Sequence, residues 1–150
     1  MFTFYEPGPL VDGALELQLI AKIAANPDKG FVPVYSFQMV RRPSVEVVGA
    51  IQFRVGNTAM IRFYAGHLGY TVQPAHRGNR YAARSGCLLL PLAQKHQINP
   101  LWITCNPDNA ASRRTCELMG AYLVDIVDLP SENTMYQKGE RRKCRYRLDL

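Results

Sequence analysis

The most informative part of this 150-residue chain reads Gly69-Tyr-Thr-Val-Gln-Pro-Ala-His-Arg-Gly-Asn-Arg-Tyr-Ala-Ala83. It starts as a strand, passes through a loop that contains Arg77 and Gly78, and ends in residues that begin a helix. A helix N-terminus presents unpaired backbone N–H groups and a partial positive charge, which together bind phosphate. The stretch therefore predicts either a phosphate-binding turn or an ordinary loop that contains a glycine.

The residues before this stretch read mainly as strands. Hydrophobic alternation and turn residues predict strands over 14–20, 34–40, 45–55 and 60–72. The first segment also contains strong helix formers through Ala25, so a helix is an alternative there. Gly66 and Gly69 fall inside the last segment, where glycine marks a bulge or the close approach of another backbone. Short turns between these segments predict an antiparallel meander.

The residues after it alternate between helix and strand. Helices are predicted over 79–97 and 106–119, and strands over 101–105, 122–127 and 143–148. Pro91 lacks a backbone donor, so it predicts a kink or break of the first helix near Cys87 to Leu90. The whole order predicts one α/β (α+β) domain over residues 1–150, with a mixed, mostly antiparallel sheet and helices on both faces.

The second predicted helix carries polar residues on one side. Asn106 and Pro107 are its expected N-cap and first-turn proline, and Gly120 is its expected C-terminal cap. Asn109, Ser112 and Cys116 stand three and then four positions apart, so they share one helix face. This face predicts either the wall of a slot or a solvated surface.

The two segments together resemble the GNAT N-acetyltransferases. That superfamily carries an [Arg/Gln]-x-x-Gly-x-[Gly/Ala] loop after its fourth strand, which this chain matches at Arg77 and Ala82 but not at Arg80. The Asn-x-x-Ser…Gly-Ala pattern at 109–121 is similar to that of the subgroup that acetylates ribosomal-protein N-termini. The resemblance covers about residues 48–127 and implies a GNAT-like sheet whose fourth and fifth strands splay apart.

The resemblance also implies residues that bind acetyl-CoA. In GNAT proteins the loop amides hold the CoA pyrophosphate, the pantetheine arm lies between the splayed strands, and a strand N–H polarises the thioester carbonyl. The implied cofactor-binding residues are Tyr70, Val72, Arg77, Gly78, Asn79, Arg80, Tyr81, Ala82, Asn109 and Ser112.

Two catalytic residues are implied by position. Relatives carry a glutamate base where this chain has His67, and a tyrosine acid where it has Cys116. A base is useful because holding a lysine-like amine neutral at pH 7 costs roughly 4.6 kcal/mol. His67 could equally be a structural histidine, and Cys116 a small packing residue. Tyr70, Tyr122 and Tyr136 are other candidate acids.

Composition narrows the remaining classes. The four cysteines form no CxxC pair and no zinc-finger spacing, so no metal site is expected and the thiols fit a cytoplasmic protein. No apolar run reaches the ~18 residues of a membrane span, and no signal peptide is evident. The net charge is +6, and six of the eighteen basic residues lie over residues 138–147. Such a cluster suits the binding of a polyanion or a solvated face.

These observations predict direct acetyl transfer from acetyl-CoA to a primary amine. The acceptor is a small molecule, a protein N-terminus or a lysine, and a homodimer is compatible with the sequence. One alternative is a non-catalytic acyl-CoA-binding regulatory module, which the departures at Arg80 and Cys116 leave open. A less favoured alternative is an RNA- or ribosome-binding protein that uses the basic C-terminal residues.

Overall fold

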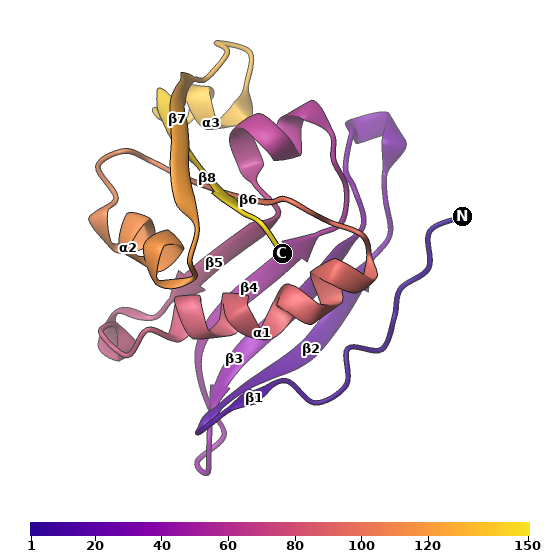
Figure 1. Ribbon diagram of the computed structural model, residues 1–150, viewed down its shortest axis with the longest axis vertical. Coiled ribbons are helices and arrows are strands. Elements are labelled where there is room, and N and C mark those ends of the chain that lie inside the picture. The colour runs from indigo at the N-terminus through magenta and orange to yellow at the C-terminus, as the bar shows by residue number, and fades with distance from the viewer.

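The computed structural model describes residues 1–150 as two antiparallel sheets with helices packed against them (Figure 1). The larger sheet has the strand order β1-β2-β3-β4-β5. These strands span Val11–Asp12, Leu15–Ile23, Val34–Arg41, Glu46–Arg54 and Leu68–Val72. The smaller sheet has the order β6-β8-β7, in which β6 is Leu101–Cys105, β7 is Tyr122–Asp128 and β8 is Arg142–Leu148. The predicted fold class, a mostly antiparallel α/β domain, is confirmed.

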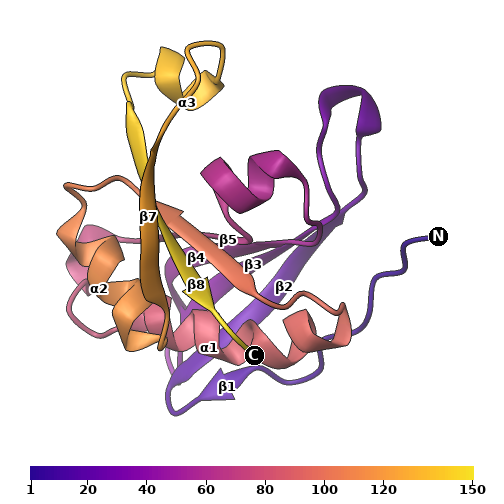
Figure 2. The same cartoon turned by 45° about the horizontal axis from the view of Figure 1, so that its top comes forward.

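The helices are α1, α2 and α3, and three further helical turns lie in the connections between elements. The helices span Tyr81–Lys95, Ala110–Leu118 and Thr134–Gln137, and the turns η1, η2 and η3 span Pro27–Lys29, Ile61–Ala65 and Pro74–His76. The N-terminal part of α1 lies beside α2 at one side of the molecule (Figures 1 and 2). None of the helices has the length and apolar character that crossing a membrane would require.

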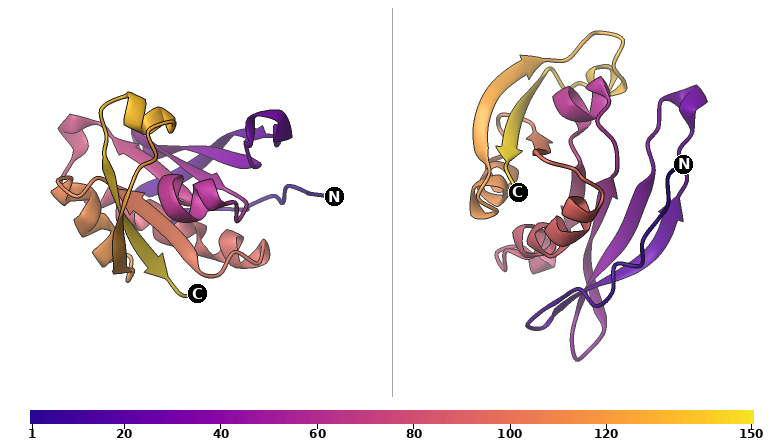
Figure 3. Two further views of the ribbon diagram at one scale, coloured as in Figure 1. Left: turned by 90° about the horizontal axis from the view of Figure 1, so that it is seen from above. Right: turned by 45° about the vertical axis from the view of Figure 1, so that its right-hand side comes forward.

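Helix α1 covers one face of the larger sheet and contacts β4 and β5. Its buried residues Leu89 and Leu92 join a core of 26 residues. Burying each side chain of this size contributes roughly 1.5–3 kcal/mol. On the opposite face of the central strand β4, Ala50 and Gln52 are exposed. Helices therefore cover one face of this sheet rather than both, and Figure 3 shows the other face open.

All the predicted strands exist, but one of them is shorter than expected. The strand predicted over 60–72 is a turn of π-helix, η2, followed by β5. The amide of Gly66 bonds to the carbonyl oxygen of Ile61 at 2.8 Å, and Gly66 has φ 73°, which ends the helical turn. Ile61, Phe63 and Ala65 are apolar at every second position, so their pattern imitates a strand.

Helix α1 continues through Pro91, so the predicted break is not found. Pro91 and Cys87 are both exposed, and the Cys87 carbonyl that lacks its helical donor therefore faces water. The start of α2 also differs from expectation. Asn109, rather than Asn106, is its N-cap, because the Asn109 side chain accepts a hydrogen bond from the Ser112 amide at 3.1 Å.

Candidate functional site

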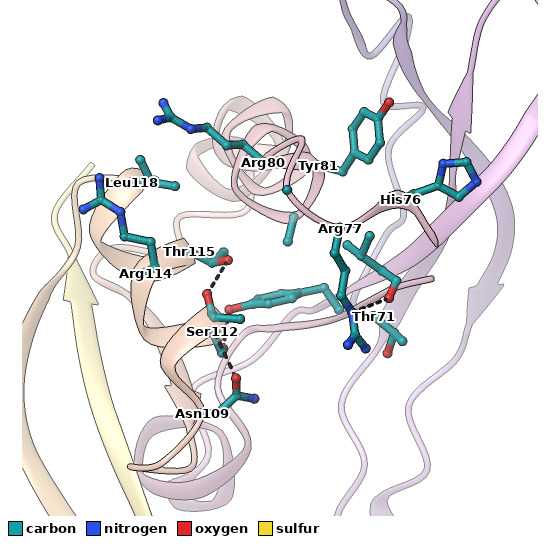
Figure 4. A pocket seen from close by; sticks show the side chains of 15 residues that line it. Thr71, His76, Arg77, Arg80, Tyr81, Asn109, Ser112, Arg114, Thr115 and Leu118 are labelled. Atoms are coloured by element: carbon teal, nitrogen blue, oxygen red, sulfur yellow. Dashed lines mark hydrogen bonds between the residues drawn. The ribbon is translucent and has the colours of Figure 1, made fainter. Parts of the chain in front are cut away.

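A cavity of about 690 Å³ opens between β5, the start of α1 and one face of α2 (Figure 4). β5 supplies Tyr70, Thr71 and Val72 to its wall. The loop that follows and the start of α1 supply His76, Arg77, Gly78, Arg80, Tyr81 and Ala82. α2 and its N-cap supply Asn109, Ala111, Ser112, Arg114, Thr115 and Leu118. The two stretches singled out from the sequence thus line one cavity from opposite sides.

The start of α1 carries a row of free backbone donors. None of the amides from Gly78 to Ala83 has a hydrogen-bond partner within the chain, and the first helical bond joins the Arg84 amide to the Arg80 carbonyl. No side chain caps this helix end. Gly78 has φ 93°, a backbone conformation that favours glycine and turns the loop into the helix. Free amides together with the positive end of the helix dipole form a binding site for an anion.

The free edge of β5 adds backbone groups to the cavity. The amide of Gln73 bonds to the carbonyl of Val48 in β4 at 2.8 Å. Because antiparallel pairing alternates, Tyr70 and Val72 direct their N–H and C=O groups away from β4. β6 makes no ladder with β5, so these groups face a gap. The resemblance predicted that the fourth and fifth strands of the superfamily splay apart. Those strands correspond to β5 and β6 here, and this gap separates them.

His67 closes the gap at its narrow end. Its amide donates to the Trp102 carbonyl at 2.7 Å, and its Nδ1 accepts from the Trp102 amide at 2.9 Å. Its Nε2 lies 2.9 Å from the Gly56 carbonyl oxygen and so carries the proton. The side chain is fully buried, and burial lowers its pKa to about 4. His67 does not line the cavity, and its neutral ring joins β5 to β6.

A pair of hydroxyl groups bridges the cavity floor. The Tyr70 phenol and the Ser112 hydroxyl lie 2.8 Å apart, which joins β5 to α2. Burial raises the pKa of Tyr70 far above its usual value, so the phenol keeps its proton. Tyr70 is therefore a hydroxyl donor at the point where the two walls of the cavity meet.

Cys116 lies beneath this pair and does not reach the cavity. It is fully buried next to Cys105, and both thiols are free. The neighbouring Cys105 thiol and burial together raise the pKa of Cys116. Cys116 keeps its proton, but its side chain is fully buried and does not line the cavity.

Positive charge gathers at the rim without matching carboxylates. Arg77, Arg80 and Arg114 line the cavity and form no ion pair, whereas the imidazole of His76 lies 3.2 Å from the Glu46 carboxylate. Free cations beside free amides favour a ligand with several negative charges. No group of three or more histidine, cysteine or acidic side chains is arranged to hold a metal ion.

The structure brings most of the predicted site residues together. Nine of the ten implied cofactor-binding residues line the cavity, and the tenth, Asn79, lies in the same loop. His67 and Cys116 lie outside it. The other six lining residues were not singled out from the sequence; they are Thr71, His76, Ala111, Arg114, Thr115 and Leu118. Arg114 is two positions from Ser112 in the polar segment of α2. Its exposed position on a helix gave no signal beyond a solvated cation.

Comparisons with known proteins point to one family. The family model for the acetyltransferase (GNAT) domain matches residues 3–121. A GNAT-family acetyltransferase from Bacillus anthracis is 16% identical, with a TM-score of 0.58 over 76% of this chain and 65% of that one. A ribosomal-protein-S5-alanine acetyltransferase from Vibrio fischeri is 15% identical, with a TM-score of 0.60 over 77% of this chain and 61% of that one.

A third solved structure matches over nearly its full length. It is a ribosomal L7/L12 alpha-N-protein acetyltransferase in complex with coenzyme A, 12% identical, with a TM-score of 0.68 over 95% of this chain and 98% of that one. The chain thus spans less than two thirds of the first two structures but almost all of the third. None of the curated proteins matches the sequence significantly. Because these identities are between 12% and 16%, the three structural matches show a shared fold and nothing further.

Proposed function

Because the chain belongs to the acetyltransferase (GNAT) domain family, we propose that it binds acetyl-CoA in this cavity and transfers the acetyl group directly to an amine. The observation that carries the proposal is the row of six unpaired amides from Gly78 to Ala83. A pyrophosphate offers oxygen acceptors that these donors lack within the chain. Each contact between an anion and a helix end contributes roughly 0.3–1 kcal/mol when exposed, and more when partly buried.

The gap between β5 and β6 would hold the pantetheine arm. The backbone groups of Tyr70 and Val72 face this gap and have no partner strand. An extended arm that carries amides can bond to them as a further strand would. Of these two residues, Tyr70 has the amide nearer the closed end of the gap. There it would stabilise the charge that develops on the thioester oxygen.

Tyr70 is also the proposed acid. Its phenol stays protonated in the free protein and bonds to Ser112. As the C–S bond breaks, the phenol would donate its proton to the leaving sulfur, while the proton of the attacking amine passes to the phenolate oxygen and restores the phenol. Cys116 held this role in the sequence-based interpretation. Its buried position beneath Tyr70 instead supports packing under the phenol.

His67 is proposed as a positioning residue rather than a base. Both ring nitrogens are engaged within the fold, and the ring does not meet the cavity. Without this base, an acceptor amine has to arrive neutral. Holding a lysine of pKa ~10.4 neutral at pH 7 costs roughly 4.6 kcal/mol, whereas holding an α-amino group of pKa ~8.0 neutral costs roughly 1.4 kcal/mol. We therefore favour an α-amino group, such as a protein N-terminus, as the acceptor.

Release of free CoA thiol tests the proposal. Acetyl-CoA is offered with a peptide that has a free α-amine, and with a lysine peptide whose α-amine is blocked. We expect faster release with the free α-amine, and a loss of about a hundredfold in kcat in Tyr70→Phe. Tyr122→Phe is the matched control, because the phenol of Tyr122 lies on exposed β7. CoA binding without thiol release for any amine would instead support the non-catalytic module.

A further inference from the structure

Arg80 stands in a conformation that arginine rarely adopts. It is the residue before α1, with φ 60° and ψ 27°, in the left-handed region. Holding a residue other than glycine there costs about 1–2 kcal/mol. The GNAT loop pattern usually has glycine at this position, which adopts this conformation without strain. This chain has an arginine there instead. Arg80 makes no hydrogen bond or ion pair through its guanidinium group, so nothing within the chain offsets this strain.

A second free arginine faces the same cavity from the other wall. Arg114 projects from α2, is exposed, and forms no ion pair even with Glu117, one turn further along. In Figure 4 the side chains of Arg80 and Arg114 point to the same side of the cavity, while Arg77 points toward Thr71 on the opposite side. The cavity thus has two separate cationic regions.

A neighbouring arginine shows what a structural role looks like. Arg84 lies one turn beyond Arg80 in α1. Its Nε donates to the Asp12 carboxylate at 2.9 Å, and a second nitrogen donates to the Asp12 carbonyl at 2.6 Å. Those bonds join α1 to β1. The contrast indicates that Arg80 and Arg114 are available for a ligand rather than for the fold.

We propose that Arg80 and Arg114 bind the 3′-phosphate of CoA, so that the cavity selects CoA over 3′-dephospho-CoA. This inference rests on the proposed function, in which the free amides from Gly78 to Ala83 take the pyrophosphate. CoA carries one further phosphate, a monoester with about −1.5 to −2 charge at pH 7. Two guanidinium groups from facing helices match its charge and its oxygen acceptors.

Calorimetric titration of the full chain with CoA and with 3′-dephospho-CoA tests the proposal. We expect the wild type to bind CoA about tenfold more tightly. Arg80→Asn and Arg114→Ala should each remove most of this preference, because each weakens the binding of CoA more than it weakens that of 3′-dephospho-CoA. Both variants should fold, because asparagine tolerates the left-handed region and alanine favours a helix. Arg80→Lys should keep part of the preference.

Lys29→Ala is the control for net charge, because Lys29 lies in η1, between β2 and β3, and does not line the cavity. It should leave the preference unchanged. Equal wild-type affinities for both ligands would overturn this inference and leave the proposed function standing. The same follows if either arginine variant weakens both ligands equally, or if Lys29→Ala lowers the preference as much as they do. Binding of neither ligand to the wild type would refute the proposed function itself.

Discussion

The two helices that face the cavity begin in opposite ways. α2 begins at Asn109, whose side chain accepts the Ser112 amide and closes the helix end. α1 begins at Arg80, which offers no acceptor, and its first amides stay free. A capped end supplies its own acceptor, so it gains stability but loses affinity for an anion. Under the proposed function, the free end of α1 serves the ligand, whereas the capped end of α2 serves the stability of the fold.

The largest expected effect on stability concerns His67. This residue joins β5, which leads into α1, to β6, which leads into α2. The unfolded imidazole has a pKa near 6.5, whereas the folded one is lowered to about 4 by burial. Below pH 6.5 the unfolded chain therefore takes up the proton first. The contribution of neutral His67 to the free energy of unfolding is fully present above pH 6.5 and is lost as the pH falls toward 4. This linkage amounts to about 3 kcal/mol in the free energy of unfolding.

Urea unfolding of the wild type and of His67→Gln between pH 7 and pH 4 measures this effect. Glutamine can accept the Trp102 amide but does not titrate in this range. The wild type should lose about 3 kcal/mol more than the variant across the window. Parallel curves for the two proteins would mean that His67 is not the buried neutral link between β5 and β6.

The Arg80→Asp substitution changes the charge at the start of α1. A carboxylate, which repels anions, replaces a cation beside the free amides. We expect CoA binding to weaken by about a hundredfold, or about 2.7 kcal/mol. The thermal midpoint should not fall, because a negative charge at a helix N-terminus is stabilising. Unchanged CoA affinity, measured by calorimetry, would show that the ligand does not approach this helix end.

The third prediction removes the cap from α2. In Asn109→Ala the Ser112 amide loses its acceptor, which should lower the free energy of unfolding by about 1 kcal/mol. Asn133→Ala is the matched control, because Asn133 caps the short helix α3 through the Met135 amide at 2.8 Å and lies outside the cavity. Chemical denaturation measures both. If Asn109→Ala left the free energy of unfolding unchanged while Asn133→Ala lowered it, α2 would not depend on its cap, and the contrast between the two helix starts would be lost.

The start of α1 could be predicted from the sequence because its signal is local. Residues 69–83 carry the strand end, the glycine and the helix start in one stretch, and the structure places a strand, a turn and α1 there. The Asn109–Ser112–Cys116 spacing was equally local. It located α2 and the polar wall that Asn109 and Ser112 give to the cavity.

The role of His67 could not be found in this way. Its partner Trp102 is 35 residues further along the chain, and only the folded β5–β6 junction shows that both ring nitrogens are engaged. Cys116 shares a helix face with Ser112, and only the folded structure shows that it is fully buried and lies outside the cavity. The strained backbone of Arg80 was equally hidden, because its sequence neighbours permit an ordinary helix start.

Amide hydrogen exchange, followed by NMR with and without CoA, tests the cavity assignment most directly. The amides from Gly78 to Ala83 have no partner in the chain and should exchange rapidly until CoA is added. Saturating CoA should then slow their exchange, while exposed amides in the β2–β3 connection stay unchanged. If CoA binds and these six amides exchange as fast as before, the pyrophosphate lies elsewhere and the account of this helix end is wrong.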